Sequence, residues 1–141
     1  MPQGLSAARA TMFPFVRYHD APVAIAWLVQ AFGFEERAVY PGPDNTIAHA
    51  ELGFGGSVLM LGSAKDDELG LKTARDIGAV TQGIYVHVPD IDAHYARARA
   101  AGAEIVYELR TTDYGSREYG ARDLEGNLWS FGTYVPGTAP A

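Results

Sequence analysis

The sequence predicts an α+β fold built from two tandem copies of a βαβββ unit. Strand-like and helix-like runs follow one another in the same order in each half of the 141-residue chain. Each helix-like run starts after an aspartate that can cap it and stops before a glycine, and a further glycine precedes the last strand. These three positions recur about 70 residues later, as a duplication requires. The pairs are Asp20 and Asp90, Gly33 and Gly102, and Gly56 and Gly126.

The first unit is expected over residues 12–62, after an N-terminal tail at residues 1–11. Residues 12–18 are rich in aromatic and β-branched side chains, which is typical of a strand. A helix follows, because Pro22 fits the first helical turn and the apolar residues after it recur at helical spacing. Further strands are predicted at residues 34–40, 46–52 and 57–61.

The second unit is expected over residues 83–135. It starts with a strand at residues 83–88, and Asp90 or Asp92 caps a helix that runs to Ala101. The three strands that complete the unit are predicted at residues 104–109, 117–122 and 128–134.

A charged segment at residues 63–82 separates the two units. A solvated linker is the favoured reading, because long charged connections are common between fused units. The alternative is a lid over a binding site. Residues 136–141 are expected to form a C-terminal tail.

Composition excludes several classes of function. The chain has no cysteine, which rules out a disulfide framework and a thiolate metal site. Eleven basic and seventeen acidic residues give a net charge of −6, which disfavours a nucleic-acid partner. No apolar run is long enough to span a bilayer, and residues 1–10 lack the apolar core of a secretory signal. A cytoplasmic protein with no membrane partner is therefore expected.

Two stretches of the chain carry a family likeness. The first joins residues 18–22 (YHDAP), through a helix, to residues 31–34 (AFGF) and 49–52 (HAEL). The second joins residues 114–119 (YGSREY) to residues 122–131 (RDLEGNLWSF), in which an acidic-X-X-Gly-Asn hairpin is the most specific element. Together they resemble the vicinal oxygen chelate superfamily, which includes glyoxalase I, bleomycin-resistance proteins and extradiol dioxygenases. Within it the chain is most similar to the bleomycin-resistance and glyoxalase-like binding proteins.

The resemblance implies that the strands of the two units form an open, barrel-like cup with the binding site on its concave face. Many members of the superfamily are dimers whose sites draw on both subunits, so a homodimer is expected. In the members that use a metal, four inward-facing strand residues bind the ion. Their counterparts in this chain are Phe13, Met60, Gly83 and Ser130.

These four residues cannot hold a divalent ion, because transition-metal sites need imidazole, carboxylate or thiolate donors. A shift by one residue brings no better donors, since the neighbours are Met12, Leu59, Ile84 and Trp129. No metal and no other cofactor is therefore expected, and glyoxalase I or dioxygenase activity is disfavoured. An apolar cup with a few polar groups suits an organic ligand instead.

Alternation along the strands predicts the rest of the cup lining, and strand and loop positions beside it complete the set of candidates. The candidate ligand-binding residues are Phe13, Phe15, Arg17, His49, Glu51, Val58, Met60, Tyr85, His87, Tyr114, Arg117 and Ser130. The side chains on the opposite strand faces should form the core beneath the helices. They are Val16, Leu59, Leu61, Val86, Trp129 and Phe131.

Several candidates have a second reading. Arg17 fits either a carboxylate or phosphate of the ligand or a nearby carboxylate of the protein. A structural hydrogen-bonding role is favoured for His87 over a catalytic one. A hairpin role is favoured for Tyr114 and Arg117 over ligand gating. His94, on the second helix, is expected to face solvent.

The leading hypothesis is a metal-free binding protein that sequesters a partly aromatic or cationic small molecule, as in antibiotic resistance. Two alternatives stay open. One is a glyoxalase-like lyase or isomerase that uses His87 or Glu51 as a base, with no metal or with one relocated to His49, Glu51 and His87. The other is an interaction module without a small ligand. No residue is assigned a catalytic role from the sequence.

Overall fold

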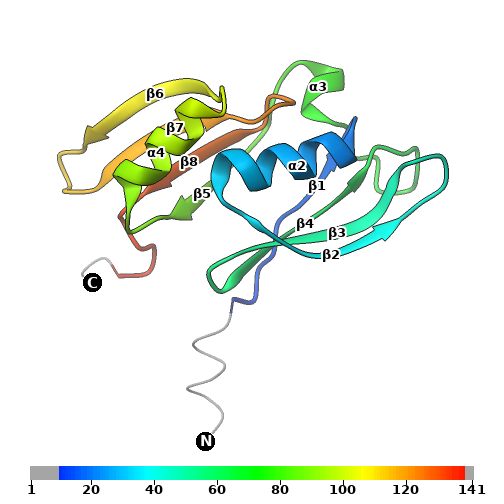
Figure 1. The fold of residues 1–141 in the computed structure, drawn as a ribbon, viewed down its shortest axis with the longest axis horizontal. Coiled ribbons are helices and arrows are strands. Elements are labelled where there is room, and N and C mark those ends of the chain that lie inside the picture. Colours follow the sequence, from blue (N-terminus) through cyan, green and yellow to red (C-terminus); the bar gives the residue numbers. More distant parts are fainter. Residues whose placement is uncertain (1–9, 139–141) are drawn as a thin grey trace, which may run out of the picture.

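The computed structural model describes residues 10–138 and confirms the predicted α+β fold of two βαβββ units (Figure 1). Residues 1–9 and 139–141, which hold most of the two expected tails, lie outside the described residues. Each unit forms a four-stranded sheet, and the two sheets stay separate rather than closing into a barrel. No helix within the described residues is long and apolar enough to cross a membrane.

Both units follow the same path along the chain. The first unit contains β1 (Phe15–Tyr18), α2 (Ala21–Phe32), β2 (Glu35–Pro41), β3 (Ile47–Phe54) and β4 (Ser57–Ser63). The second unit contains β5 (Gly83–His87), α4 (Ile91–Ala100), β6 (Glu104–Thr111), β7 (Arg117–Arg122) and β8 (Leu128–Gly132). A short helix, α3 (Ala74–Ile77), lies in the segment that connects them.

Strand order is the same in the two sheets, β1-β4-β3-β2 and β5-β8-β7-β6. The first and last strands of each unit are parallel neighbours, so Phe15 pairs with Met60 and Tyr85 pairs with Ser130. The remaining pairs are antiparallel. Alternate side chains on each strand therefore point toward the helices or away from them.

The residues expected to bound the helices do so. Asp20 caps α2, and Gly33 ends it in the left-handed region at φ 77°, where a glycine needs no strain. Asp90 rather than Asp92 caps α4. Asp92 instead pairs with Arg117 at 2.9 Å.

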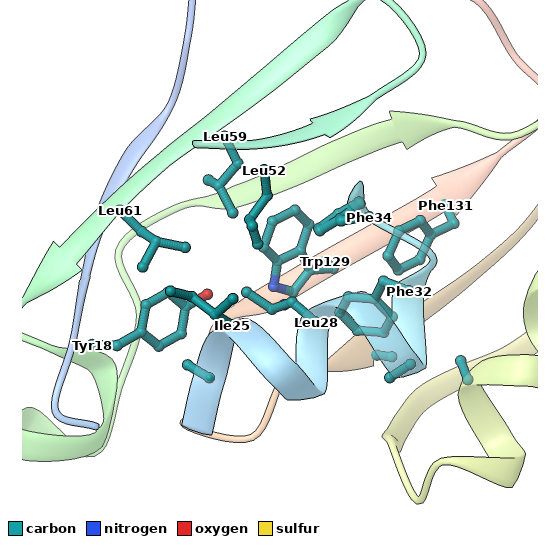
Figure 2. Close-up of a cluster of buried hydrophobic side chains, with 14 of the residues drawn as sticks. Tyr18, Ile25, Leu28, Phe32, Phe34, Leu52, Leu59, Leu61, Trp129 and Phe131 are labelled. Carbon is teal, nitrogen blue, oxygen red and sulfur yellow. The ribbon is translucent and has the colours of Figure 1, made fainter. Parts of the chain in front are cut away.

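One core lies between the helices and the helix-facing sides of both sheets (Figure 2). The predicted core residues Leu59, Leu61, Trp129 and Phe131 are buried, and Val16 and Val86 pack against them partly buried. Phe32, at the end of α2, joins the two units. The centre of its ring lies 5.7 Å from the ring centre of Trp129 and 4.8 Å from the ring centre of Phe131. Helix α2 therefore packs against the second sheet as well as its own.

Asp123, in the hairpin before β8, connects the second unit to the first. Asp123 is 6% exposed. Its carboxylate accepts hydrogen bonds from the Tyr18 hydroxyl at 2.7 Å and from the Trp129 indole nitrogen at 3.0 Å. It also accepts hydrogen bonds from the backbone N–H groups of Glu125 and Asn127, both at 3.0 Å. Burial, and then the Asp123 charge, raise the pKa of the Tyr18 hydroxyl, so Tyr18 remains a donor.

Both ends of α2 are held by side chains of the second unit. At its start, the buried Glu125 carboxylate accepts the backbone N–H groups of His19 at 2.7 Å and Asp20 at 2.8 Å. At its end, Arg97 Nε donates to the Gln30 carbonyl at 2.8 Å. The terminal backbone groups of a helix have no hydrogen-bond partners inside the helix, and these contacts provide partners for some of them.

His94 is buried on α4, so the expectation that it faces solvent is wrong. The side of α4 that carries it turns toward α2. Nε2 lies 2.8 Å from the Phe32 carbonyl, which can only accept, so Nε2 carries the proton. Nδ1 is then the acceptor for the Tyr119 hydroxyl at 2.6 Å. Burial lowers the pKa of His94, in agreement with this neutral ring.

We expect Asp123→Ala to lower the free energy of unfolding by about 3 kcal/mol or more, because it leaves several buried donors without an acceptor. Urea denaturation measures this change. Asp113→Ala, which removes an exposed carboxylate from the β6–β7 loop, is the matched control and should change stability by less than about 0.5 kcal/mol. Equal effects of the two substitutions would show that Asp123 does not hold the units together.

The stabilisation from His94 should depend on pH. The pKa of its ring is lowered in the folded protein, so the unfolded chain takes up a proton first as the pH falls below about 6.5. The contribution is fully present above that pH and is lost below it. We expect the difference in unfolding free energy between wild type and His94→Gln to shrink from about pH 7 to about pH 5. A difference that stays constant or grows toward acid pH would contradict the buried neutral ring.

Candidate functional site

The side of each sheet that faces away from the helices is open. The first open face carries Phe15, Arg17, His49, Glu51, Val58 and Met60. The second open face carries Tyr85, His87, Tyr107, Glu118 and Ser130. Most of the predicted ligand set is thus divided between two surfaces of one chain, which lie side by side in Figure 1.

The first open face brings apolar and ionisable side chains together. Phe15 is 57% exposed and lies opposite Met60, which lies opposite Glu51 on β3. His49 Nε2 is 2.9 Å from Glu51 Oε2, and the Tyr40 ring stacks on His49 with the ring centres 6.1 Å apart. An apolar strip therefore runs beside an imidazole–carboxylate pair.

Arg17 pairs with a carboxylate of the protein. Its side chain is 10% exposed, and Nη2 donates to Asp67 Oδ2 at 2.9 Å. Nη1 donates to the Lys65 carbonyl at 3.3 Å. The hydrogen bond from Arg17 is the main cause that lowers the pKa of the Asp67 carboxyl. These contacts hold the connecting segment against the first open face.

Two tyrosine rings lie close to the backbone of the second open face. A β-carbon at Gly120 would stand 2.9 Å from the Tyr107 ring, and the Tyr107 hydroxyl donates to Ser130 Oγ at 3.0 Å. A β-carbon at Gly132 would stand 2.8 Å from the Tyr85 hydroxyl oxygen. Glycine at both positions thus gives the rings room, and aromatic rings placed in this way suit a ligand that stacks.

The other three predicted residues lie elsewhere. Tyr114 is 66% exposed in the β6–β7 loop, but its hydroxyl reaches Glu118 on the second open face at 2.9 Å. Arg117 points to the helix side, where it pairs with Asp92, so the structure does not bring it to either open face. Phe13 precedes β1 and is exposed.

The positions that the resemblance maps onto metal ligands do not provide a donor set here. Met60 lies opposite Phe15, and Ser130 lies opposite Tyr85. Within residues 10–138, no group of three or more His, Asp or Glu side chains could hold a metal ion. The relocated site of His49, Glu51 and His87 is not assembled within one chain, because the first two belong to one sheet and His87 to the other. Within one chain, the residues that the structure describes do not fit a metal.

A hollow of about 500 Å³ lies between the two sheets. Phe34, Leu52 and Trp129 from the core line its base, and the β3–β4 hairpin and β5 form its walls. This volume is in the range of small-molecule pockets. The predicted residues that line it are Val58, Tyr85 and His87.

Three tyrosine and glutamate residues near the second open face were not among the predicted site residues: Tyr107, Glu118 and Tyr134. Counting alternate positions onward from Ser130 could have found Tyr134, whereas β7 offered no correctly placed residue from which to count to Glu118. Tyr107 is harder to predict, since register shifts interrupt the β6–β7 pairing on both sides of it.

The fold and its open faces define a protein of the paired-βαβββ class. The chain belongs to the Glyoxalase/Bleomycin resistance protein/Dioxygenase superfamily, whose family model matches residues 11–131. The uncharacterized protein Mb0911c of Mycobacterium bovis is 35% identical over 124 residues, which cover 86% of this chain and 82% of that protein.

Solved structures agree with this membership. TioX from Micromonospora sp. ML1 is 34% identical with a TM-score of 0.74, over 89% of this chain and 99% of TioX. TnmS3, described as an antibiotic binding protein from Streptomyces sp. CB03234, is 20% identical with a TM-score of 0.65, over 86% of this chain and 93% of TnmS3. The lactoylglutathione lyase of Agrobacterium tumefaciens is 22% identical with a TM-score of 0.63, over 87% of this chain and 92% of the lyase. The last two show likeness of fold alone.

Proposed function

We propose that the protein binds a small, partly aromatic organic molecule without a protein-bound metal. The observation that carries this proposal is the set of aromatic and apolar side chains that remain accessible on both open faces. Phe15, Met60, Tyr85 and Tyr107 lie there, each with only part of its surface buried. Accessible apolar groups with a few fixed polar groups between them are typical of ligand sites.

The comparisons support a binding role of this kind. TnmS3 has the same fold and is described as an antibiotic binding protein. The mapped metal positions hold Phe13, Met60, Gly83 and Ser130, whose side chains lack the donors that a catalytic metal needs. Sequestration of an antibiotic or a similar compound is therefore favoured over metal-dependent turnover.

The cup that encloses the ligand would be completed by a second copy of the chain. In one chain the two open faces lie side by side, so neither closes over the other (Figure 1). A two-fold dimer would place the first open face of one copy opposite the second open face of its partner, twice. The exposed apolar residues Met12 and Phe13, which precede β1, and Phe15, at its start, are suited to such a contact. A single-chain mass in light scattering would contradict the dimer and leave the separate faces as binding surfaces.

In isothermal titration, we expect the protein to bind planar aromatic compounds and to take up no stoichiometric Zn²⁺ or Ni²⁺. Phe15→Ala should weaken aromatic binding by about tenfold, because an aromatic stacking contact is lost. Val23→Ala, which shortens an exposed apolar side chain on α2, is the control and should leave binding unchanged. Failure of every aromatic compound to bind, together with tight metal uptake, would defeat the proposal.

A second candidate function is a metal-free lyase or isomerase reaction on the first open face. The observation that favours it is the 2.9 Å contact between His49 and Glu51, which orients the imidazole and leaves Nδ1 free to take a proton from a C–H group beside a carbonyl. Deuterium incorporation into hydroxyacetone, followed by NMR, tests this. The activity should disappear in His49→Gln and persist in His87→Gln. Incorporation no faster than in buffer would exclude this candidate for that substrate class.

A further inference from the structure

Glu118 is a mostly buried residue, and the carboxylate oxygen that has no partner in the protein remains accessible. It lies on β7 at the second open face and is 9% exposed. Its side chain accepts one hydrogen bond, from the Tyr114 hydroxyl at 2.9 Å. None of the ion pairs among residues 10–138 includes it. Buried carboxylates are usually paired with a cation or with several donors, so Glu118 stands out on this surface.

Two tyrosines, Tyr114 and Tyr85, lie beside this carboxylate, and a third, Tyr134, contacts both of them. The Tyr114 ring meets the Tyr134 ring edge to face, with centres 6.3 Å apart and planes at 85°. The Tyr85 hydroxyl donates to the Tyr134 carbonyl at 2.6 Å. Tyr85 and Glu118 both lie over Gly132, where a β-carbon would stand 2.8 Å from the Tyr85 oxygen and 2.7 Å from Glu118 Cγ. We call Glu118 with Tyr85, Tyr114 and Tyr134 the tyrosine–glutamate cluster.

The cationic side chain on the neighbouring strand lies over another ring. Arg110 lies opposite Glu118 in the β6–β7 pairing, but its guanidinium carbon stands 4.4 Å from the centre of the Tyr107 ring. His87 lies opposite Gly132 on the other side. The Glu118 hydrogen bond is the main cause that raises the pKa of the Tyr114 hydroxyl. For Tyr85, whose pKa is also raised, burial is the main cause and the Glu118 charge adds to it. Both rings therefore remain neutral phenols beside a negative charge.

Aromatic ring faces and a carboxylate together attract a cation that carries a weak hydration shell. Alkylammonium groups meet this description and are recognised by aromatic cages. A hard metal ion needs more oxygen ligands than one carboxylate provides. The net charge of −6 adds a long-range attraction for cations.

We propose that the tyrosine–glutamate cluster binds the ammonium group of a small organic cation. The inference rests on the proposed function, because the cluster lies at one end of the second open face. The uncharged part of the ligand would extend from the cluster along that face, past Tyr107 and Ser130.

Tetramethylammonium chloride is the probe, followed by NMR of the tyrosine ring signals, with potassium chloride at equal ionic strength as the reference. We expect saturable shifts that potassium does not produce. Glu118→Gln keeps the shape of the side chain and an acceptor for Tyr114, and it should weaken binding by about tenfold or more. Glu36→Gln, an exposed carboxylate on β2, makes the same change of net charge and should bind as wild type does.

Tyr114→Ala is the second variant, because its exposed loop position makes it safe for folding, and it should weaken tetramethylammonium binding about threefold to tenfold. Circular dichroism checks that each variant is folded. Identical shifts with tetramethylammonium and potassium, or wild-type affinity in both Glu118→Gln and Tyr114→Ala, would overturn the cation site. The uncharged aromatic probe 7-methoxycoumarin separates the two proposals. Its binding, without any response to tetramethylammonium, would leave the proposed function standing and remove only the cation site.

Discussion

The arrangement of the two units depends on two buried carboxylates in one hairpin. Asp123 accepts a hydrogen bond from the Tyr18 hydroxyl, and Glu125 accepts hydrogen bonds from the two backbone N–H groups that precede α2. Apolar contacts around Phe32 supply much of the burial, but they are not directional and would tolerate a range of angles between the units. Hydrogen bonds to ionised carboxylates have narrow geometry and leave costly unpaired groups when broken. They therefore select one relative orientation of the sheets.

This orientation determines where a ligand can bind. With α2 and α4 in contact on one side of the molecule, the core is shared there and the opposite sides of both sheets are left open. Side chains on an open face are free of the packing constraints of a core, so their size and charge can match a ligand instead. Gly132 and Gly120 contribute to the shape of this face. Without a side chain there, the Tyr85 and Tyr107 rings can approach the sheet closely.

Local structure can be predicted well from the sequence, whereas contacts between distant segments can be predicted only poorly. Asp20, Gly33 and Asp90 end or start helices for reasons that lie within a few residues, and alternation assigns Leu61 and Phe131 to the core. His94 is buried by Phe32 at the end of α2 together with Tyr119 and Phe131 of its own sheet, and these contacts between separate elements cannot be read from α4 alone. The direction of Arg117 likewise follows from a partner, Asp92, that lies on a separate element.

Because residues 10–138 of one chain provide no metal-ligand set, other groups must orient a ligand in this protein. A bound ion holds a ligand through a few strong bonds from a central point, whereas apolar side chains such as Phe15 and Met60 give affinity with little direction. Direction must then come from polar groups that are themselves fixed. On the second open face these are Glu118, held by Tyr114, and Ser130, held by Tyr107. Because a buried carboxylate is fixed by its neighbours before the ligand arrives, little ordering remains for binding to impose, and charge can select the ligand.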